Sequence, residues 1–462
     1  MAYGWSQWSA GRELSDRDVI ILGGGIAGIA AAVHLVKRGI KPTLIERRPF
    51  LGGRAFSFMD RISGEEIDNG QHVILGVCHQ FLDLLEDLGT RDQLDLRPAL
   101  NVPVSMNGKT SNLRANRVFG NAIALLNYRH LPLSDRMSIF RLLFKIKLKL
   151  IGENESQRMR TTSFGNWLSS RGQSSAAIER FWSLFILPVF NCHIDEVAAL
   201  DGLEFTRSAL LGNVRDAAIG YPKTGLSSLI GTPATEFLRS GGAELKTNTR
   251  VVSFARGDSG HFEVGLSNDE TLRSSNVISA LAPNSLNGVL PMSDATFNAV
   301  KNSLSALDYS PIVAVHLWYE KPVMLVPVEA FLDLGLQWVF NDTAIRGRLS
   351  DGPQHIVVSL SGADSWASLR KEEILDRVSS AMRRAFPAAR ENSVVNSAVV
   401  KTLEATIKVN PASLDHRLGP NVGIAGFHVA GDWTNTGLPA TMEGAVKSGQ
   451  TAADLALQRL SA

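Results

Sequence analysis

The chain of 462 residues is 44% hydrophobic and 20% charged, which predicts a globular protein with two or three cores. A net charge of +2, without a block of Lys or Arg, argues against a nucleic-acid partner. The two cysteines, Cys78 and Cys192, form no C-x-x-C pair. This argues against a disulfide framework, a structural zinc site and a redox dithiol, and favours a reducing, cytoplasmic compartment.

Residues 1–17 contain Trp5 and Trp8 among charged side chains but lack the apolar core of a signal peptide. We therefore expect a flexible N-terminal extension. No window of the chain approaches ~18 uninterrupted apolar residues, so we expect no transmembrane segment.

A strand, a glycine-rich turn, a helix and a second strand open the regular part of the chain. The β-branched run 19–22 predicts a short buried strand. A helix is predicted from 26 to about 38, where a glycine ends it, and a strand at 42–45 leads to Glu46. This order of elements is typical of the βαβ unit that binds dinucleotides.

The turn between the first strand and the helix has the pattern G-x-G-x-x-G, formed by Gly23, Gly25 and Gly28. The first glycine makes the tight turn, the second lets the backbone approach a pyrophosphate, and the third lets helix and strand pack closely. The helix N-terminus adds free N–H groups and the positive end of its dipole. Glu46, after the second strand, is placed to accept hydrogen bonds from a ribose. Together these features predict a dinucleotide site.

A second glycine doublet, Gly52-Gly53, follows Glu46 and is followed in turn by Arg54. This doublet resembles that of the superfamily of FAD-dependent amine oxidases and carotenoid desaturases. The resemblance implies that the dinucleotide is FAD.

A hairpin that turns at 63–64 is predicted, and the polar segment Asp68-Asn69-Gly70-Gln71-His72 follows it. Polar residues around a glycine suggest a turn that faces a ligand, but a plain polar turn has the same composition. The residues alone leave both interpretations open.

The region from 76 to 214 contains no phosphate-binding loop, and its apolar periodicity predicts helices at 81–88, 135–150, 164–170 and 175–189. We interpret it as a substrate-binding cap. The helix at 135–150 is both basic and apolar, so it is either a segment that lies on an anionic membrane surface or an ordinary cap helix with a solvated basic edge.

The nucleotide-binding pattern resumes after the cap. A helix is predicted at 224–239, and strands at 249–254, 262–266 and 276–280. A second group of elements, the strands 312–318, 336–340 and 354–360 and the helix 371–385, suggests an α+β lobe.

The last motif begins with a strand that ends at Gly431-Asp432, and a helix starts near Thr441. An Asp at a strand end can bind a ribityl hydroxyl. A helix N-terminus aimed at the flavin pyrimidine would stabilise the negative charge of the reduced ring.

The predicted fold is α/β: a Rossmann-like, glutathione-reductase-like FAD-binding domain with an inserted α+β substrate domain. We assign 18–75, 215–285 and 405–462 to the FAD-binding domain. The substrate-binding domain then comprises 76–214 and 286–404, after the extension 1–17.

The chain resembles the squalene-associated FAD-dependent desaturase family, also called the hydroxysqualene dehydroxylase family. The D-N-G-Q-H, H-L-W and G-D-W-T sequences are the specific signals, whereas the glycine motifs belong to the whole superfamily. One departure is Asn191-Cys192-His193-Ile194, where a Thr-Pro-like continuation is expected, and it concerns the shape of the cap. The stretches that carry the resemblance are 66–73, 310–318, 336–340, 430–434 and 437–445.

The resemblance implies a reductive dehydroxylation, in which reduced FAD delivers a hydride to an allylic carbon of hydroxysqualene and the hydroxyl leaves as water. The product, squalene, would serve hopanoid or sterol synthesis. Such a step needs an acid at the departing hydroxyl and an apolar tunnel. We favour His72 or Asp68 as the acid, because they lie in the most polar of the specific stretches. Other candidates for the acid are His316, Tyr221 and Asp432, and the tunnel candidates are Phe181, Trp182, Phe185, Ile186, Leu187, Trp318 and Trp338.

Pattern and resemblance together give one set of residues predicted to contact the cofactor. Val252 enters it because the corresponding strand of the superfamily meets the adenine through its backbone. The predicted FAD-binding residues are Gly23, Gly25, Gly28, Glu46, Arg47, Gly53, Arg54, Gly70, Gln71, Val252, Gly431, Asp432 and Met442.

Two other functions stay open from the sequence. The first is another flavin oxidoreductase, such as a carotenoid desaturase working in the oxidative direction or an amine oxidase. The second is a non-catalytic protein that holds FAD within a lipid-enzyme assembly. Because the chain has one nucleotide motif, the electron donor is unknown, and a lipid-soluble substrate would favour a peripheral position on the inner face of the membrane.

Overall fold

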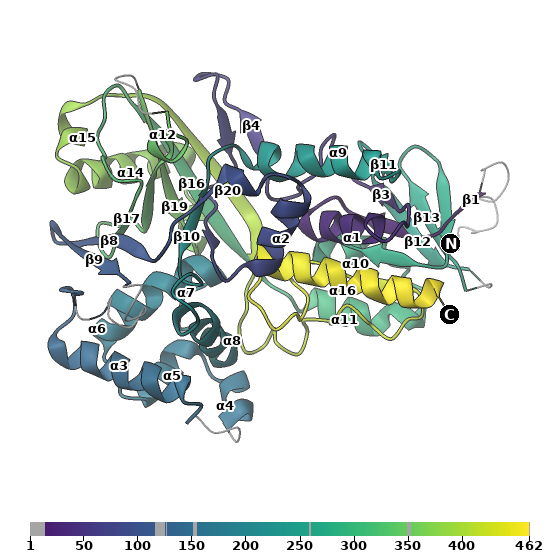
Figure 1. Ribbon diagram of the computed structural model, residues 1–462, viewed down its shortest axis with the longest axis horizontal. Helices are drawn as coiled ribbons and strands as arrows, with labels where there is room; N and C mark the ends of the chain where they lie inside the picture. Colours follow the sequence, from purple (N-terminus) through teal and green to yellow (C-terminus); the bar gives the residue numbers. More distant parts are fainter. Residues whose placement is uncertain are drawn as a thin grey trace.

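The computed structural model describes residues 14–115, 125, 127–150, 155–257, 260–348 and 353–461. The molecule has three parts (Figure 1). A nucleotide-binding lobe, built on a parallel sheet, occupies one end. The other end is divided between a sheet lobe, built on seven strands, and a helical cap that contains α3 to α8.

The nucleotide-binding lobe is organised around five short strands that come from three distant parts of the chain. All neighbouring pairs are parallel. The three central strands are buried along their whole length because helices and a second sheet cover both faces. In spatial order the strands are β11 (Glu244–Lys246), β3 (Thr43–Ile45), β2 (Ile20–Leu22), β15 (Val277–Ser279) and β21 (Phe427–Val429).

Helices α1 (Ile26–Val36) and α16 (Met442–Leu460) pack against each other on one face of this sheet (Figure 1). Their backbones approach closely, since a Cβ added to Gly449 would lie 2.2 Å from the carbonyl oxygen of Ala27. Helix α9 (Thr232–Ser240) packs beside α1, and α2 (His79–Asp87) packs beside α16. Helix α2 therefore belongs to this lobe and not, as its position after residue 76 suggested, to the cap.

A four-stranded sheet covers the other side of the lobe, together with α10 (Pro283–Val289) and α11 (Asn298–Ser305). Phe254, Phe262, Phe297 and Phe427 form the aromatic core between them. Helix α11 thus joins the nucleotide-binding lobe, although it follows the predicted boundary at 285. The strands are β1 (Leu14–Arg17), β14 (Thr271–Ser274), β13 (Phe262–Leu266) and β12 (Val251–Arg256).

Strand β1 corrects the predicted extent of the N-terminal extension. Residues 14–17 are not a flexible tail, because they pair in parallel with β14. The backbone hydrogen bonds of that pairing fix a segment whose side chains gave no strand signal. Residues 1–13 lie outside the described part of the chain.

The sheet lobe contains seven strands. Its longest, β20, pairs with β16 over nearly its whole length and runs through the predicted domain boundary at 405. Helix α14 (Lys371–Ala385) packs on the outer face of this sheet, and the short α12 (Asp342–Ile345), α13 (Asp364–Ala367) and α15 (Ala388–Glu391) lie nearby. In spatial order the strands are β20 (Val394–Ile407), β16 (Tyr309–Tyr319), β19 (Gln354–Leu360), β18 (Trp338–Asn341), β17 (Val328–Phe331), β8 (Asn101–Met106) and β9 (Lys109–Arg114).

The helical cap has a core rich in aromatic side chains, in which Phe164 contacts Trp167 and Trp182. Two short π-helical segments, Ile178–Trp182 and Thr206–Leu210, lie within it. Its helices are α3 (Leu133–Lys147), α4 (Ser156–Thr161), α5 (Phe164–Ser170), α6 (Ser175–Ala177), α7 (Ser183–Phe190) and α8 (Ala199–Phe205).

Two small sheets connect the three parts. The hairpin of β4 (Ser57–Met59) and β5 (Glu66–Asp68) ends at the start of the D-N-G-Q-H segment. The other sheet joins β6 (Ile74–Leu75), β10 (Ile219–Pro222) and β7 (Leu94–Leu96). Both therefore lie next to segments that the sequence marked as functional.

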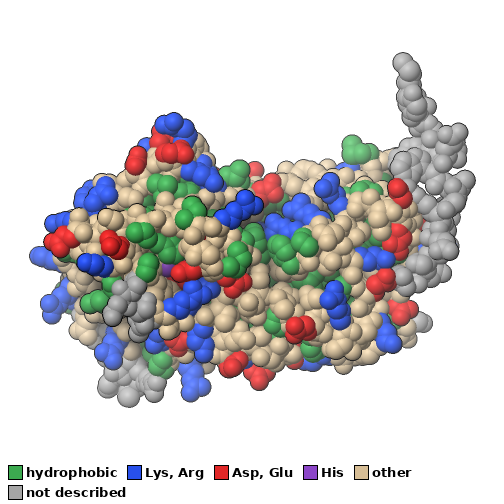
Figure 2. All heavy atoms as spheres, turned by 90° about the horizontal axis from the view of Figure 1, so that it is seen from above, with side chains coloured by type: hydrophobic (Ala, Val, Ile, Leu, Met, Phe, Trp, Pro, Cys, Tyr) green, Lys and Arg blue, Asp and Glu red, His purple; other side chains and the backbone are tan. Residues whose placement is uncertain are grey.

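Charges of both signs are interspersed on the face of the molecule shown in Figure 2. Within the described ranges, no helix is both long and apolar enough to cross a bilayer. The same residues contain no group of three or more His, Cys, Asp or Glu side chains arranged to hold a metal ion.

Candidate functional site

A cavity of about 1030 Å³ lies where the three parts of the molecule meet. This volume is at the upper end of the range of about 300–1,000 Å³ that is usual for ligand pockets. The cavity extends from the glycine-rich turn before α1, past the start of α16 and the inner face of β20, to helix α7 of the cap. It therefore joins the nucleotide-binding lobe to the predicted substrate-binding region.

The cavity brings together nearly all the residues that the sequence marked. Among the predicted FAD-binding residues and the two favoured acids, Gly28 and Asp68 do not line it. Gly28 lies in α1, where an added Cβ would meet the carbonyl oxygen of Gly23 at 1.9 Å, so it serves close packing as expected. The predicted residues in the wall are Gly23, Gly25, Glu46, Arg47, Gly53, Arg54, Gly70, Gln71, His72, Val252, Gly431, Asp432 and Met442.

The glycine turn and the glycine doublet form one continuous cradle. A Cβ added to Gly53 would lie 2.8 Å from the Cα of Gly25, so any side chain there would force the two segments apart. Gly25 is the N-cap of α1, and no side chain caps the helix. Its first N–H groups are thus available to an anion, which is what a pyrophosphate requires.

Glu46 is held at the end of β3. Its carboxylate accepts hydrogen bonds from the backbone N–H of Gly24 (2.8 Å) and of Arg48 (2.9 Å). A carboxylate has about four lone-pair sites, so two remain for ribose hydroxyls. The two backbone bonds orient the carboxylate at the cavity wall.

Val252 lies at an irregularity in the pairing of β12 with β13. The register shifts between Val251 and Ser253, so Val252 is the extra residue of a β-bulge. Such a residue is left out of the ladder pairing. Its backbone polar groups can therefore serve a ligand in the cavity, which fits the backbone contact expected for the adenine.

Arg54 and Asp432 form an ion pair across the cavity wall. Burial lowers the pKa of Arg54, but the neighbouring Asp432 outweighs burial and raises it. Arg54 also donates to the carbonyl oxygen of Ala405 in β20, at 2.7 Å. The pair thus ties the glycine doublet to the last motif of the chain.

The N-terminus of α16 opens onto the cavity, where Thr441 and Met442 line the wall. Glu443 also lines the wall, and its carboxylate accepts hydrogen bonds from the backbone N–H groups of Gln80 (3.0 Å) and Phe81 (2.8 Å) at the start of α2. The positive end of the α16 dipole therefore points at the cavity, as reduced flavin requires.

His72 lies in the cavity wall, with Nδ1 2.8 Å from the carbonyl oxygen of Gly70. Because a carbonyl oxygen only accepts, Nδ1 carries the proton, and in the neutral ring Nε2 is an acceptor. Burial lowers the pKa of His72, while Asp68 and the bond to Gly70 act in the opposite direction. Asn69, also in the wall, has an Oδ1 atom with no hydrogen-bond partner among the described residues.

Asp68 is buried beside the cavity. Its carboxylate accepts from Ser57 Oγ (2.6 Å) and the backbone N–H of Leu226 (2.9 Å), and Arg346 pairs with it at 3.1 Å. These bonds hold the carboxylate away from the cavity, so of the two favoured acids only His72 reaches the site.

Of the remaining acid candidates, one lines the cavity and two do not. Asp432 lines the cavity, whereas His316 and Tyr221 are buried side chains outside its wall. Burial lowers the pKa of His316 to about 3 and raises that of Tyr221.

The cap side of the cavity is apolar. Of the side chains predicted for a tunnel, Phe185 and Trp338 line it. Trp182 packs in the core of the cap and Trp318 stacks on His355, so these two belong to the interior. Further apolar residues of the wall, beyond those predicted, include Pro188, Val189, Leu210, Val289, Ile312 and Phe340.

Sequence reasoning missed the contribution of β20. Its residues Thr402, Glu404 and Thr406 line the cavity, together with Asn284 and Ser285 of α10. Thr402, Glu404 and Thr406 alternate along the strand, as residues of one face of a sheet do, and Ala405 joins them in the wall where the pairing with β16 shifts register. That alternation was the available signal, but it is a weak one in a segment with few buried residues.

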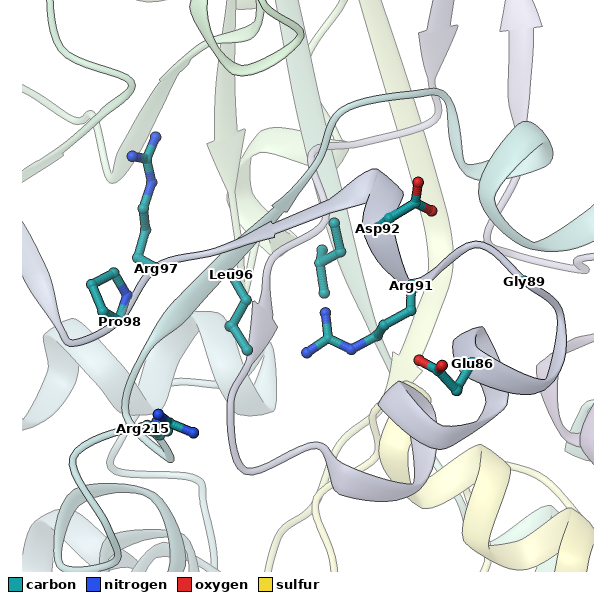
Figure 3. A pocket seen from close by; sticks show the side chains of 9 residues that line it. Glu86, Gly89, Arg91, Asp92, Leu96, Arg97, Pro98 and Arg215 are labelled. Carbon is teal, nitrogen blue, oxygen red and sulfur yellow. The ribbon is translucent and has the colours of Figure 1, made fainter.

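A second cavity, of about 740 Å³, opens beside the C-terminal end of α2 (Figure 3). The three-stranded sheet separates the two cavities, since Leu75 and Ile219 line the large one and Leu96 lines the small one. Its wall mixes Glu86 and Asp92 with three arginines, Arg91, Arg97 and Arg215, and this mixture defines no single ligand charge.

These features together define an FAD-binding oxidoreductase. They are a parallel βαβ unit with a glycine cradle, an acid at the end of its second strand, and a helix N-terminus at the far side of one large cavity. Comparison with known proteins agrees. The chain belongs to the family of flavin containing amine oxidoreductases, whose sequence profile matches residues 26–457. It is therefore an FAD-dependent enzyme of that family.

The relatives include enzymes with different substrates. A protein of Sinorhizobium fredii named hydroxysqualene dehydroxylase is 25% identical over 448 residues, which cover 96% of this chain and 98% of that protein. A zeta-carotene desaturase of Zea mays is 26% identical over 474 residues, covering 94% and 82%. The solved structure of a putrescine oxidase double mutant has a TM-score of 0.75 at 20% identity, covering 97% and 100%, which shows a shared fold.

Proposed function

We propose that the protein catalyses the reductive dehydroxylation of hydroxysqualene to squalene, for hopanoid or sterol synthesis. The observation that carries the proposal is the single cavity that runs from the glycine cradle into an apolar pocket of the cap. Similarity to three hydroxysqualene dehydroxylases, over 95–96% of this chain and 98% of each of them, supports the choice of substrate.

The proposed cofactor contacts follow the wall of the cavity. The cradle at Gly25 and Gly53 takes the pyrophosphate, Glu46 the ribose, and Val252 the adenine. Asp432 and the start of α16 take the ribityl chain and the flavin ring. When bound and reduced, FAD supplies the hydride that replaces the hydroxyl on the allylic carbon.

The chain itself must supply a proton, because the C–O bond breaks with release of water. His72 is the proposed acid, since its Nε2 is the ring nitrogen left free by the bond from Nδ1 to Gly70. Only the imidazolium, which is protonated on both nitrogens, can donate from Nε2. Because burial lowers the pKa of His72, turnover is expected to fall as pH rises through that lowered pKa.

The direction of electron flow provides the test. Dithionite-reduced enzyme is mixed anaerobically with hydroxysqualene, and the return of oxidised flavin absorbance is followed together with the appearance of squalene. We expect both. General acids contribute about 10²- to 10⁴-fold, so His72→Ala is expected to lower turnover by that factor without changing the flavin spectrum. A wild-type rate in this variant would move the proton source to a bound water.

A carotenoid-type desaturase is the second candidate, because a zeta-carotene desaturase is as similar in identity as the dehydroxylases are. Such an enzyme would be reduced by its substrate and would need an oxidant. Reduction of the oxidised enzyme by squalene or by a carotene precursor, without reoxidation by hydroxysqualene, would establish this function and exclude the first.

We also propose that the enzyme works at the inner face of a membrane, through α3. The buried side of this helix carries Ile139, Leu142, Leu143 and Ile146. On the opposite side an exposed apolar stripe recurs every three or four residues. The stripe, Leu133, Met137, Phe140, Phe144 and Leu148, is accompanied by exposed Arg141, Lys145, Lys147 and Lys149.

An exposed apolar stripe flanked by cations matches an anionic lipid surface, where each basic side chain contributes about 1 kcal/mol. Hydroxysqualene partitions into lipid, so a docked helix would place the cap at the store of substrate. The electron donor that reduces FAD is the one partner for which we propose no identity.

A further inference from the structure

Asp68 lies where three segments meet: the β4–β5 hairpin, the residues before α9 and the end of α12. Its carboxylate is bonded to Ser57 of the β4–β5 hairpin, to the backbone of Leu226 before α9, and to Arg346 after α12 of the sheet lobe. It is the last residue of β5, and His72 follows four residues later in a segment with little regular structure. The position of that segment therefore depends on what Asp68 binds.

Arg346 anchors this carboxylate from the side of the sheet lobe. Its side chain is 3% exposed and pairs both with Asp68 Oδ2 (3.1 Å) and, through Nε, with Asp342 (2.9 Å). A planar guanidinium can hold two carboxylates in fixed directions, which an ammonium group cannot do. Arg346 thus acts as a rigid connector between the sheet lobe and the segment that carries His72.

Arg346 is itself held in place by a chain of buried side chains that begins at Asp342. Asp342 Oδ2 lies 3.0 Å from His355 Nδ1, and His355 Nε2 lies 3.0 Å from His316 Nδ1. The ring of Trp318 stacks on His355 with centroids 4.3 Å apart and planes 1° from parallel. This buried chain leaves Arg346 little freedom to turn, and it holds the pKa of Asp342 well below its usual range.

From this arrangement we infer that Arg346 is a positioning residue for the proposed proton donor: by pairing with Asp68 it fixes the segment bearing His72 and neutralises the Asp68 carboxylate. The inference rests on the proposed function for its kinetic consequence alone. The predicted position of the His72 segment and the predicted shifts in the pKa of His72 do not depend on the substrate.

The charges around the pair determine the sign of the effect. The groups that act on Arg346 are Asp342, Asp68 and Glu66, and the charged group that acts on His72 is Asp68, which raises its pKa. Removing Arg346 leaves Asp68 without its cation, so the pKa of His72 is expected to rise. Removing the charge of Asp68 is expected to lower it.

The test measures the titration of His72 in the oxidised holoenzyme by NMR of ring ¹⁵N-labelled histidine, with the signal assigned by its loss in His72→Gln. We expect Arg346→Gln to move the titration to higher pH, Asp68→Asn to move it to lower pH, and Arg346→Lys to restore it nearly to that of the wild type. With hydroxysqualene as substrate, Arg346→Gln is expected to lower kcat by about 10²-fold with little change in KM. The reason is that a catalytic group displaced by about 1 Å loses a factor of about that size. Arg346→Lys is expected to recover only part of kcat.

Arg348→Gln is the matched control. Arg348 lies two residues away, is half exposed and pairs with Glu65 at 3.5 Å, so its loss removes the same charge from outside the connector. If His72 has the same pKa in Arg346→Gln as in Arg348→Gln, the inference is overturned. Should Arg346→Gln fail to fold, an unchanged His72 titration in Asp68→Asn would overturn it equally. If hydroxysqualene is not the substrate, the kinetic difference disappears but the NMR shifts remain.

Discussion

Gly25 and Gly28 stand three residues apart at the start of α1, yet a side chain would meet different surroundings at each. A Cβ at Gly28 would lie 1.9 Å from a backbone oxygen, whereas at Gly25 its nearest neighbour would be the Cα of Gly53 at 3.9 Å. One glycine serves the packing of helix on strand. The other leaves space for a ligand.

This difference predicts separable effects on folding and on cofactor binding. Gly25→Val is expected to give folded protein that has lost most of its FAD, because the new side chain enters the cradle. Gly28→Ala is expected to lower the free energy of unfolding by at least about 1–3 kcal/mol, as overpacking does. Flavin absorbance of the purified proteins and their denaturant midpoints measure the two effects. A yellow Gly25→Val protein would contradict the proposed position of the pyrophosphate.

His428 predicts a pH dependence of stability. It is buried in β21, burial and Arg459 lower its pKa to about 4, and neither ring nitrogen has a hydrogen-bond partner among the described residues. The unfolded chain, with a histidine pKa near 6.5, binds the proton more readily than the folded one. Stability due to the neutral ring is therefore complete above about pH 6.5 and is lost as pH falls towards 4.

His428→Leu is expected to flatten this dependence and to raise the free energy of unfolding, because two unpaired buried polar atoms are removed at about 1–3 kcal/mol each. Denaturant unfolding at several pH values between 4 and 7 gives the measurement. His34→Leu, which removes a histidine already paired with Asp454, is the control and is expected to bring no such gain.

At the scale of the element, α3 predicts binding to lipid. Changing Lys145, Lys147 and Lys149 to Glu is expected to abolish flotation with anionic liposomes, since about 1 kcal/mol of attraction per cation is replaced by repulsion. Lys371, Arg383 and Arg384, changed to Glu in the sheet lobe, give the same change in net charge. Loss of flotation in both triple variants would show a general effect of net charge and would remove the role proposed for α3.

The elements that sequence predicts best are those with a strong local pattern. Helices α5 and α14 and strand β19 have the predicted bounds, because each has clear apolar periodicity. Strands β8, β9 and β20 were missed. Their side chains are largely polar or half-buried, so β20 is stabilised by pairing with β16 along its length and has little pattern of its own.

The predictability of the site also depends on how strong the local sequence pattern is. The nucleotide half could be predicted because its glycines and acids follow a fixed spacing next to a strand and a helix. The substrate half could not, because β20, α10 and the cap meet there from distant parts of the chain. The contact between Asp68 and Arg346 was hidden for the same reason, since 278 residues separate the two partners.

At the scale of the whole molecule, the cavity is closed by segments from all three parts, so FAD is expected to stabilise the entire fold. A ligand that binds only the native state adds about 2.7 kcal/mol at a free concentration of 100 times Kd. Thermal unfolding of the deflavinated protein should therefore shift to higher temperature as FAD is added. The same titration of Gly25→Val is the control, and an equal shift there would mean that FAD binds elsewhere.

The order of strands in the parallel sheet has a consequence for how the protein is made. Strand β15 pairs with β2 on one side and β21 on the other, and β21 and α16 are synthesised long after β2. At about 5–20 residues per second, the interval between synthesis of β2 and of α16 is on the order of a minute at the slow end. Until then α1 lacks its partner and β15 presents an open apolar edge, a known hazard for aggregation. The cavity is therefore complete only after α16 has been synthesised, because the start of that helix forms part of its wall.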